Sequence, residues 1–271
     1  MELINNEDAS IAKKITESLV YIEQAVDICI QSLRSDGRVF YIGAGTSGRL
    51  GVLDASEIPP TFSASKELFT GIIAGGDKAL KNSIEGAEDN PQQAAKDLKT
   101  HSIKEGDVLI GISSSGAAKY VQSALSYAAS IQAKTVYIVC NRTPFLKAET
   151  DVRIAIETGP EIITGSTRMK AGTATKMVLN MISTTTMIKL GKVYKNLMID
   201  LMAVNNKLID RGIRIIMKIT GLSYEKAKKK LFEAKKSVKA AIIMIKLDCD
   251  LEKANKKIKK FNGVLSNIIN D

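Results

Sequence analysis

Three short turns rich in glycine, serine and threonine have the residue types that bind a phosphate group. They are GAGTSG at 43–48, GISSSG at 111–116 and TGSTRMKAGT at 164–173. Glycines let backbone N–H groups approach an anion, and hydroxyls at a helix N-terminus donate further hydrogen bonds to it. The residues predicted to bind phosphate are Gly45, Thr46, Ser47, Ser113, Ser114, Ser115, Ser166 and Thr167.

The first turn also fits a second kind of site, because GAGTSG matches the G-x-G-x-x-G pattern of dinucleotide-binding proteins. Such proteins place an acidic residue at the end of the second strand to bind a ribose hydroxyl. Here Glu67 comes before the second strand, and Asp77 lies too far beyond its end to take the position of that acidic residue. Three hydroxyl-rich turns at one sheet edge favour a single small phosphate, although any one of them could be an ordinary capped helix start.

The elements that must position these turns are strands alternating with helices. Five apolar runs rich in β-branched residues are continuous rather than alternating, which is typical of strands covered on both faces. They lie at 38–43, 68–75, 107–113, 134–140 and 152–158. The pattern predicts an α/β fold with a doubly wound, parallel, five-stranded sheet flanked by helices, and a ligand site at the carboxyl ends of the strands.

Helices flank this core in the sequence. Apolar residues at three- and four-residue steps predict one long amphipathic helix over 7–35, and a second long helix over 168–191 that stops at Gly191. From about residue 213 short lysine-rich helical segments follow. We therefore predict a domain over 1–212 with the phosphate site, and a small all-helical subdomain over 213–271.

Composition limits the possible partners. The net charge of +10 comes mainly from the lysine-rich C-terminal region. Its lysines are interleaved with apolar residues at helical spacing, which is typical of the solvated face of small helices. We therefore expect no nucleic acid partner. No apolar run is long enough to cross a membrane, and the N-terminus lacks a secretory pattern, which predicts a cytoplasmic protein. Three cysteines are too far apart for a metal site, and the single histidine, His101, is expected at the surface.

Longer motifs around these turns carry a family resemblance. They are GAGTSGRLGVLDASEIPPTF, IAGGDKALKNSIEGAEDN and TGSTRMKAGTATKMVLNMIST, followed by GKVYKNLMIDLMAVNNKL. Together they resemble the N-acetylmuramic acid 6-phosphate etherases of the sugar isomerase (SIS) superfamily, to which the glucokinase regulatory protein is related. Within that superfamily, LDASE and EGAED are specific to the etherases.

The resemblance implies an SIS-type fold and a lyase that cleaves the D-lactyl ether of N-acetylmuramic acid 6-phosphate. It implies elimination followed by hydration, with no metal and no cofactor. Such chemistry needs a base for the C2 proton and an acid for the departing oxygen, and two carboxylates can supply both. By motif, Glu57 of DASE matches the family's proton donor and Glu88 of EGAED is assigned as the base.

Two departures from the family pattern leave alternatives open. The third-strand turn has Ala117, Ala118 and Lys119 where the family has Arg-Thr-Pro, and this sequence begins within the lead-in to the first helix, where the family has an N-terminal arm. A sugar-phosphate sensor without activity and an aldose-ketose isomerase are the competing functions. We expect a homodimer, because the long flanking helices must bury their apolar faces.

Overall fold

The computed structural model describes residues 1–201 and 203–270. Contacts divide the chain into two compact units: Met1–Ser56 with Lys66–Thr185, and Glu57–Ser65 with Thr186–Asp271. We call them the sheet unit and the helical unit. The domain boundary predicted after residue 212 stays a prediction.

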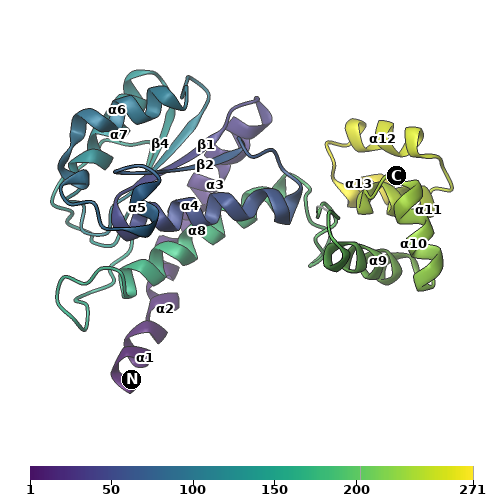
Figure 1. The fold of residues 1–271 in the computed structure, drawn as a ribbon, viewed down its shortest axis with the longest axis horizontal. Coiled ribbons are helices and arrows are strands. Elements are labelled where there is room, and N and C mark those ends of the chain that lie inside the picture. The colour runs from purple at the N-terminus through teal and green to yellow at the C-terminus, as the bar shows by residue number, and fades with distance from the viewer. Residues whose placement is uncertain (202, 271) are drawn as a thin grey trace. The chain divides into compact units, whose positions relative to one another are not determined.

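The sheet unit is built around a parallel sheet, which confirms the predicted α/β class. Its strands, in the order β2-β1-β3-β4-β5, are all parallel to their neighbours (Figure 1). Each strand lies within one of the five apolar runs of the sequence. Their bounds are β1 (Val39–Gly43), β2 (Phe69–Ile73), β3 (Val108–Ile112), β4 (Lys134–Val139) and β5 (Val152–Ala155).

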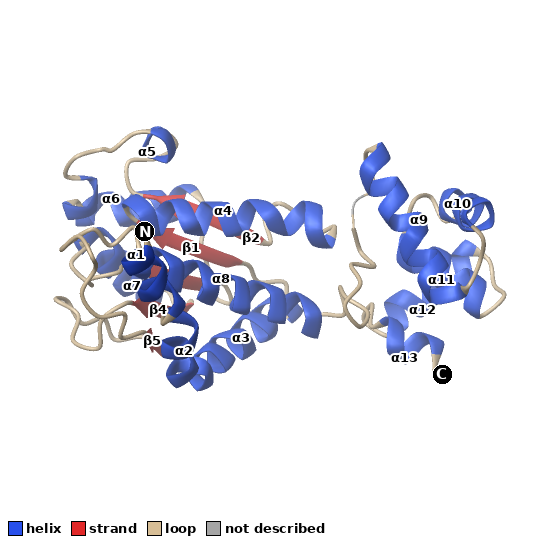
Figure 2. Ribbon diagram, turned by 90° about the horizontal axis from the view of Figure 1, so that it is seen from below, coloured by secondary structure: helices blue, strands red, loops and turns tan. Residues whose placement is uncertain are grey.

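Helices cover both faces of this sheet. On one face lie α6 (Pro91–Thr100) and α7 (Lys119–Ser130), whose apolar residues form a buried cluster with side chains of β1 and β3. On the other lie α3 (Leu19–Arg34), α4 (Gly45–Phe62) and α8 (Lys170–Lys189), as Figure 2 shows. Burial on both faces explains why the strand sequences are continuous apolar runs.

The N-terminal segment departs from the sequence prediction. The single helix expected over 7–35 is instead α1 (Glu2–Ala9), α2 (Ile11–Ile15), a 3₁₀ turn at Thr16–Ser18 and then α3. The prediction of one continuous helix was therefore wrong. Contacts outside the helix explain the break, since Lys14 Nζ donates to the carbonyl oxygen of Thr158 at 2.8 Å and Ser18 Oγ donates to that of Ala155 at 2.9 Å.

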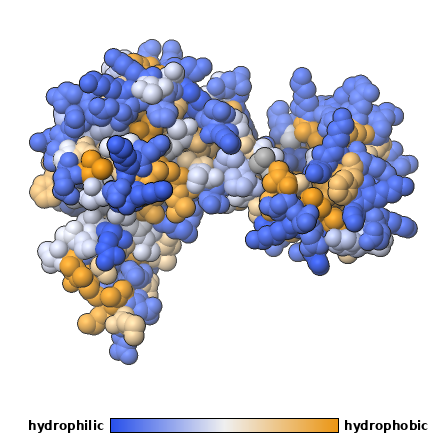
Figure 3. Space-filling view, in the orientation of Figure 1, coloured by the Kyte–Doolittle hydropathy of each residue, from blue (hydrophilic) through white to orange (hydrophobic). Residues whose placement is uncertain are grey.

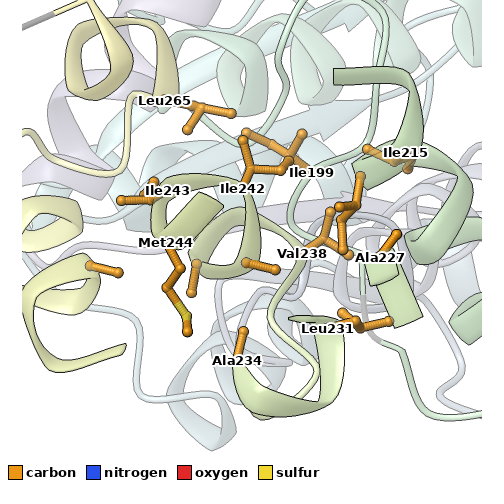
Figure 4. Close-up of a cluster of buried hydrophobic side chains, with 14 of the residues drawn as sticks. Ile199, Ile215, Ala227, Leu231, Ala234, Val238, Ile242, Ile243, Met244 and Leu265 are labelled. Carbon is orange, nitrogen blue, oxygen red and sulfur yellow. The ribbon is translucent and has the colours of Figure 1, made fainter. Parts of the chain in front are cut away.

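The helical unit confirms the predicted all-helical C-terminal region. It contains α9 (Asn206–Thr220), α10 (Tyr224–Glu233), α11 (Val238–Lys246), α12 (Leu251–Lys260) and α13 (Leu265–Ile269). The central helix α11 buries every residue from Val238 to Met244. Figure 4 shows Ile242, Ile243 and Met244 of α11 within the apolar cluster that fills this unit.

Most lysines of the helical unit lie at its surface, where Figure 3 shows hydrophilic residues over most of the visible face. Lys239 is the exception that the sequence pattern did not reveal. It is 4% exposed, and its ammonium donates to the carbonyl oxygens of Gly191 and Gly263 and to Asp200 Oδ2. Burial lowers the pKa of Lys239.

Among the described residues, no helix combines the length and apolar content that crossing a membrane requires.

Candidate active site

The first phosphate turn joins β1 to α4 where the strand order reverses. From β1 the chain crosses to β2 on one side, and the next strand, β3, pairs with β1 on the other. Ligands of doubly wound sheets bind at this place, outside the carboxyl ends of the strands. The turn is tight, because a Cβ added at Gly43 would lie 2.6 Å from the nitrogen of Gly48. Glycine is therefore required where the strand meets the helix.

The three predicted phosphate turns meet in the sheet unit. Ser47 Oγ of the first turn lies 3.5 Å from Ser114 Oγ of the second. A Cβ added at Gly172, at the start of α8, would lie 3.6 Å from Cγ2 of Thr46, so the third turn also reaches the first. A cavity of about 460 Å³ is lined by Ser114, Ser115 and Thr167 together.

Three of the predicted phosphate-binding serines, Ser47, Ser113 and Ser166, are not among the residues that line this cavity. Ser113 is 5% exposed, and its backbone N–H donates to the carbonyl oxygen of Ile138, as in the strand ladder. Ser166 is half-buried at the third turn and is not among the residues that line this cavity. Phosphate binding by all eight predicted residues stays a prediction.

Glu161 occupies the N-terminus of α8, which sequence reasoning missed. Its carboxylate oxygens accept the backbone N–H groups of Lys170 and Ala171, both at 3.0 Å. This position at a helix N-terminus is the one that an anionic ligand would otherwise take. Two backbone N–H groups at the start of α8 are therefore already satisfied, and binding of a phosphate by the hydroxyls of the third turn stays a prediction.

Glu88 lies beside the first phosphate turn. It belongs to the 3₁₀ turn η2 (Ala87–Asp89), which follows Gly86 with φ of +71°. Glu88 and Gly45 line the same cavity, whose volume is about 180 Å³. Neighbouring Glu85 accepts a hydrogen bond from Ser83 Oγ at 2.9 Å, whereas the Glu88 carboxylate accepts none from the described residues.

Glu57 lies twelve residues after Gly45 in α4, which corresponds to about 18 Å along a helix axis. It is exposed and lines neither of the two cavities. Glu57 is also the first residue that groups with the helical unit. That the carboxylates of Glu57 and Glu88 converge stays a prediction.

Asp54, one turn before Glu57, has a structural role. Its carboxylate accepts hydrogen bonds from Tyr41 at 2.9 Å, Asn180 at 2.7 Å and Ser183 at 3.2 Å. Burial raises the pKa of this carboxyl group. Asp54 thus joins α4 to β1 and α8, and it fixes the turn of the helix from which Glu57 projects.

Cys140 and His101 are two other residues whose side chains could take part in a reaction, and the structure gives neither of them a catalytic role. Cys140 lines the larger cavity but is buried, and burial raises the pKa of its thiol to about 12, so it stays protonated. His101 is exposed, as predicted. Within residues 1–201 and 203–270, no group of three or more His, Cys, Asp and Glu residues is placed to hold a metal ion.

Comparison with known proteins shows the family of this chain. The glucokinase regulatory protein N-terminal SIS domain matches residues 21–129, and the SIS domain matches residues 89–184. An N-acetylmuramic acid 6-phosphate etherase from Geobacillus sp. (strain WCH70) is 50% identical over 263 residues, covering 97% of this chain and 89% of the relative. The chain belongs to the N-acetylmuramic acid 6-phosphate etherase family. The etherase from Bacillus cereus (strain AH820) is 48% identical, with 97% and 90% covered.

A solved structure supports the fold of this etherase family member. A protein from Escherichia coli CFT073, determined as a complex with a ligand, superposes with a TM-score of 0.52 at 15% identity, covering 72% of this chain and 92% of that one. This likeness shows that the sheet and its helices follow a known arrangement. The identity of 48–50% to the two etherases, by contrast, places the chain in that family.

Proposed function

We propose that this protein is a lyase that cleaves the D-lactyl ether of N-acetylmuramic acid 6-phosphate, releasing D-lactate and N-acetylglucosamine 6-phosphate. The observation that carries the proposal is the 50% identity, over 97% of the chain, to an etherase of that name. The meeting of three hydroxyl-rich turns at the carboxyl edge of the sheet supports a phosphorylated sugar as substrate.

The proposed reaction is an elimination followed by hydration. Glu88 removes the C2 proton of the open-chain sugar, the bond between C3 and the lactyl oxygen breaks, and Glu57 gives a proton to that oxygen. Water then adds at C3. Because Glu88 and Gly45 line one cavity, the proposed base lies beside the turn that we propose binds the phosphate.

We further propose that the protein works as a homodimer in the cytoplasm. Apolar side chains stay exposed on the helices of the sheet unit: Leu19, Val20 and Tyr21 on α3 are 46%, 55% and 46% exposed, and Leu53 on α4 is 51% exposed. A second copy could cover such faces. The cysteines are free, as is usual in a reducing compartment.

The position of Glu57 supports an active site shared between the two copies. Since about 18 Å of helix separate it from Gly45, Glu57 does not reach a phosphate at the N-terminus of its own α4. A two-fold axis near exposed Leu53 would pair α4 with α4 of the partner in antiparallel fashion. Glu57 of one copy would then approach the first phosphate turn of the other.

Isotope labelling tests the proposed reaction. In oxygen-18 water, we expect the label at the C3 hydroxyl of N-acetylglucosamine 6-phosphate and none in the lactate, because elimination leaves the ether oxygen with lactate. In deuterated water, the sugar should carry deuterium at C2. Oxygen-18 in lactate would contradict elimination. A ketose product would indicate an isomerase. If the protein binds the sugar phosphate tightly but forms no product, it is a sensor.

The hydroxyl of Ser47 should strengthen phosphate binding. It is 7% exposed and lies next to Ser114 Oγ, so a phosphate there would accept a hydrogen bond shielded from water. We expect Ser47→Ala to raise KM about 10- to 100-fold, the effect of losing one hydrogen bond to a charged group. Steady-state kinetics would measure this, with Ser130→Ala, at the exposed end of α7, as the control. An unchanged KM would mean that the turn serves structure alone.

A further inference from the structure

Arg49 joins the first phosphate turn to the segment that carries Glu88. It lies in α4, four residues after Gly45, and its side chain is half-buried. Its Nε donates to the carbonyl oxygen of Leu80 at 3.1 Å, and its Nη2 donates to that of Asn82 at 2.9 Å. The planar guanidinium thus spans two carbonyl groups that lie two residues apart in the chain.

These two carbonyl groups lie at the end of the short helix α5 (Lys78–Lys81). The last carbonyls of a helix have no partner within the helix, so a side-chain donor from elsewhere stabilises them. Arg49 supplies this donor from α4. The end of α5 is therefore attached to the helix that begins at the phosphate turn.

The segment between β2 and α6 has few other anchors. Gly75, Gly76 and Gly86 all have positive φ, and residues 81–86 are exposed. Among the described apolar residues of this segment, Ala79 is buried, Ala87 packs against the cluster around α7, Leu80 is half-buried and Ile84 is 40% exposed. Segments with so few buried contacts open readily, so the two hydrogen bonds of Arg49 carry much of the attachment.

We infer that Arg49 is a positioning residue, which holds the segment 78–90 so that the carboxylate of Glu88 stays beside the phosphate turn. The inference rests on the proposed role of Glu88 as base. Arg49 and Glu88 line the same small cavity together with Gly45. Arg49 acts through the backbone of its neighbours, since the two donors described above are directed to carbonyl oxygens rather than to the phosphate turn.

The variant Arg49→Lys separates this role from direct phosphate binding. Lysine keeps the positive charge, but a single ammonium cannot reproduce the fork that spans both carbonyls. We expect kcat and the rate of C2 proton exchange to fall together, about 10- to 100-fold, because a base displaced by about 1 Å loses that much. KM should change less than about threefold. Arg214→Lys, at an exposed position of α9, is the matched control and should keep wild-type kinetics.

Chemical rescue tests the geometry directly. In Arg49→Ala, methylguanidinium should restore part of kcat because it can donate to both carbonyls, whereas ethylammonium at the same concentration should not. This comparison also keeps the inference testable if Arg49→Lys folds poorly. Equal rescue by both cations, or rescue by neither in a folded variant, would overturn it.

Amide hydrogen exchange of residues 78–90 makes the attachment testable without Glu88. Faster exchange in Arg49→Lys than in the wild type is the expected result. Unchanged exchange in this segment, or a raised KM with unchanged kcat, would overturn the inference. A third outcome is faster amide exchange of the segment together with a wild-type rate of C2 proton exchange in the substrate. It would show that Arg49 holds the segment and that Glu88 is not the base, which removes the catalytic part of the inference.

Discussion

Glu88→Gln is expected to abolish exchange of the substrate's C2 proton with solvent and, with it, the release of lactate. Removal of that proton is the first chemical step of an elimination, and a glutamine amide does not accept it. General base catalysis typically contributes 10²- to 10⁴-fold, so we expect a loss of about 1,000-fold in both rates with little change in KM. Deuterium incorporation followed by mass spectrometry measures the exchange.

Glu85→Gln is the matched control for this prediction. Glu85 lies on the same segment and lines the same cavity, but its carboxylate is bound by Ser83 Oγ. We therefore expect Glu85→Gln to keep most of the activity. If Glu85→Gln lost exchange while Glu88→Gln kept it, the roles of the two acids in EGAED would have to be reversed.

The sheet and its helices could be predicted from sequence because their signals are local. Strands buried on both faces give continuous apolar runs, and Gly191, with φ of +76°, ends a helix that the sequence already marks. The break at Thr16–Ser18 could not be predicted, because it depends on hydrogen bonds to Thr158 and Ala155, far away in the chain. The apolar period alone continues through that break.

The phosphate turns were visible in the sequence, but their supporting contacts were not. Serine and glycine at strand ends predict an anion site from composition alone. That Glu161 fills the N-terminus of α8, or that Arg49 binds the end of α5, depends on side chains meeting across loops. For the same reason the buried Lys239 looked like the other lysines of its region, since its three acceptors come from distant segments.

Glu57→Gln is expected to separate the two steps of the reaction. Without an acid, the lactyl oxygen leaves slowly, so lactate release should fall about 1,000-fold. Proton removal by Glu88 does not need that acid, so C2 exchange with solvent should persist. Ser56→Ala, at the neighbouring exposed position of α4, is the control and should release lactate at close to the wild-type rate. Lactate release by Glu57→Gln at the wild-type rate would remove Glu57 from the mechanism.

Mixing the two inactive variants tests whether Glu57 acts on the partner's substrate. A mixed dimer has one Glu57→Gln chain and one Glu88→Gln chain. One of its two shared sites takes Glu88 from the first chain and Glu57 from the second, and this site is intact. Random reassociation of equal amounts should therefore restore about a quarter of the wild-type activity, because half of the dimers are mixed and each has one intact site. A site formed within one chain would restore none. Because α4 separates Glu57 from its own phosphate turn by about 18 Å, we expect the quarter.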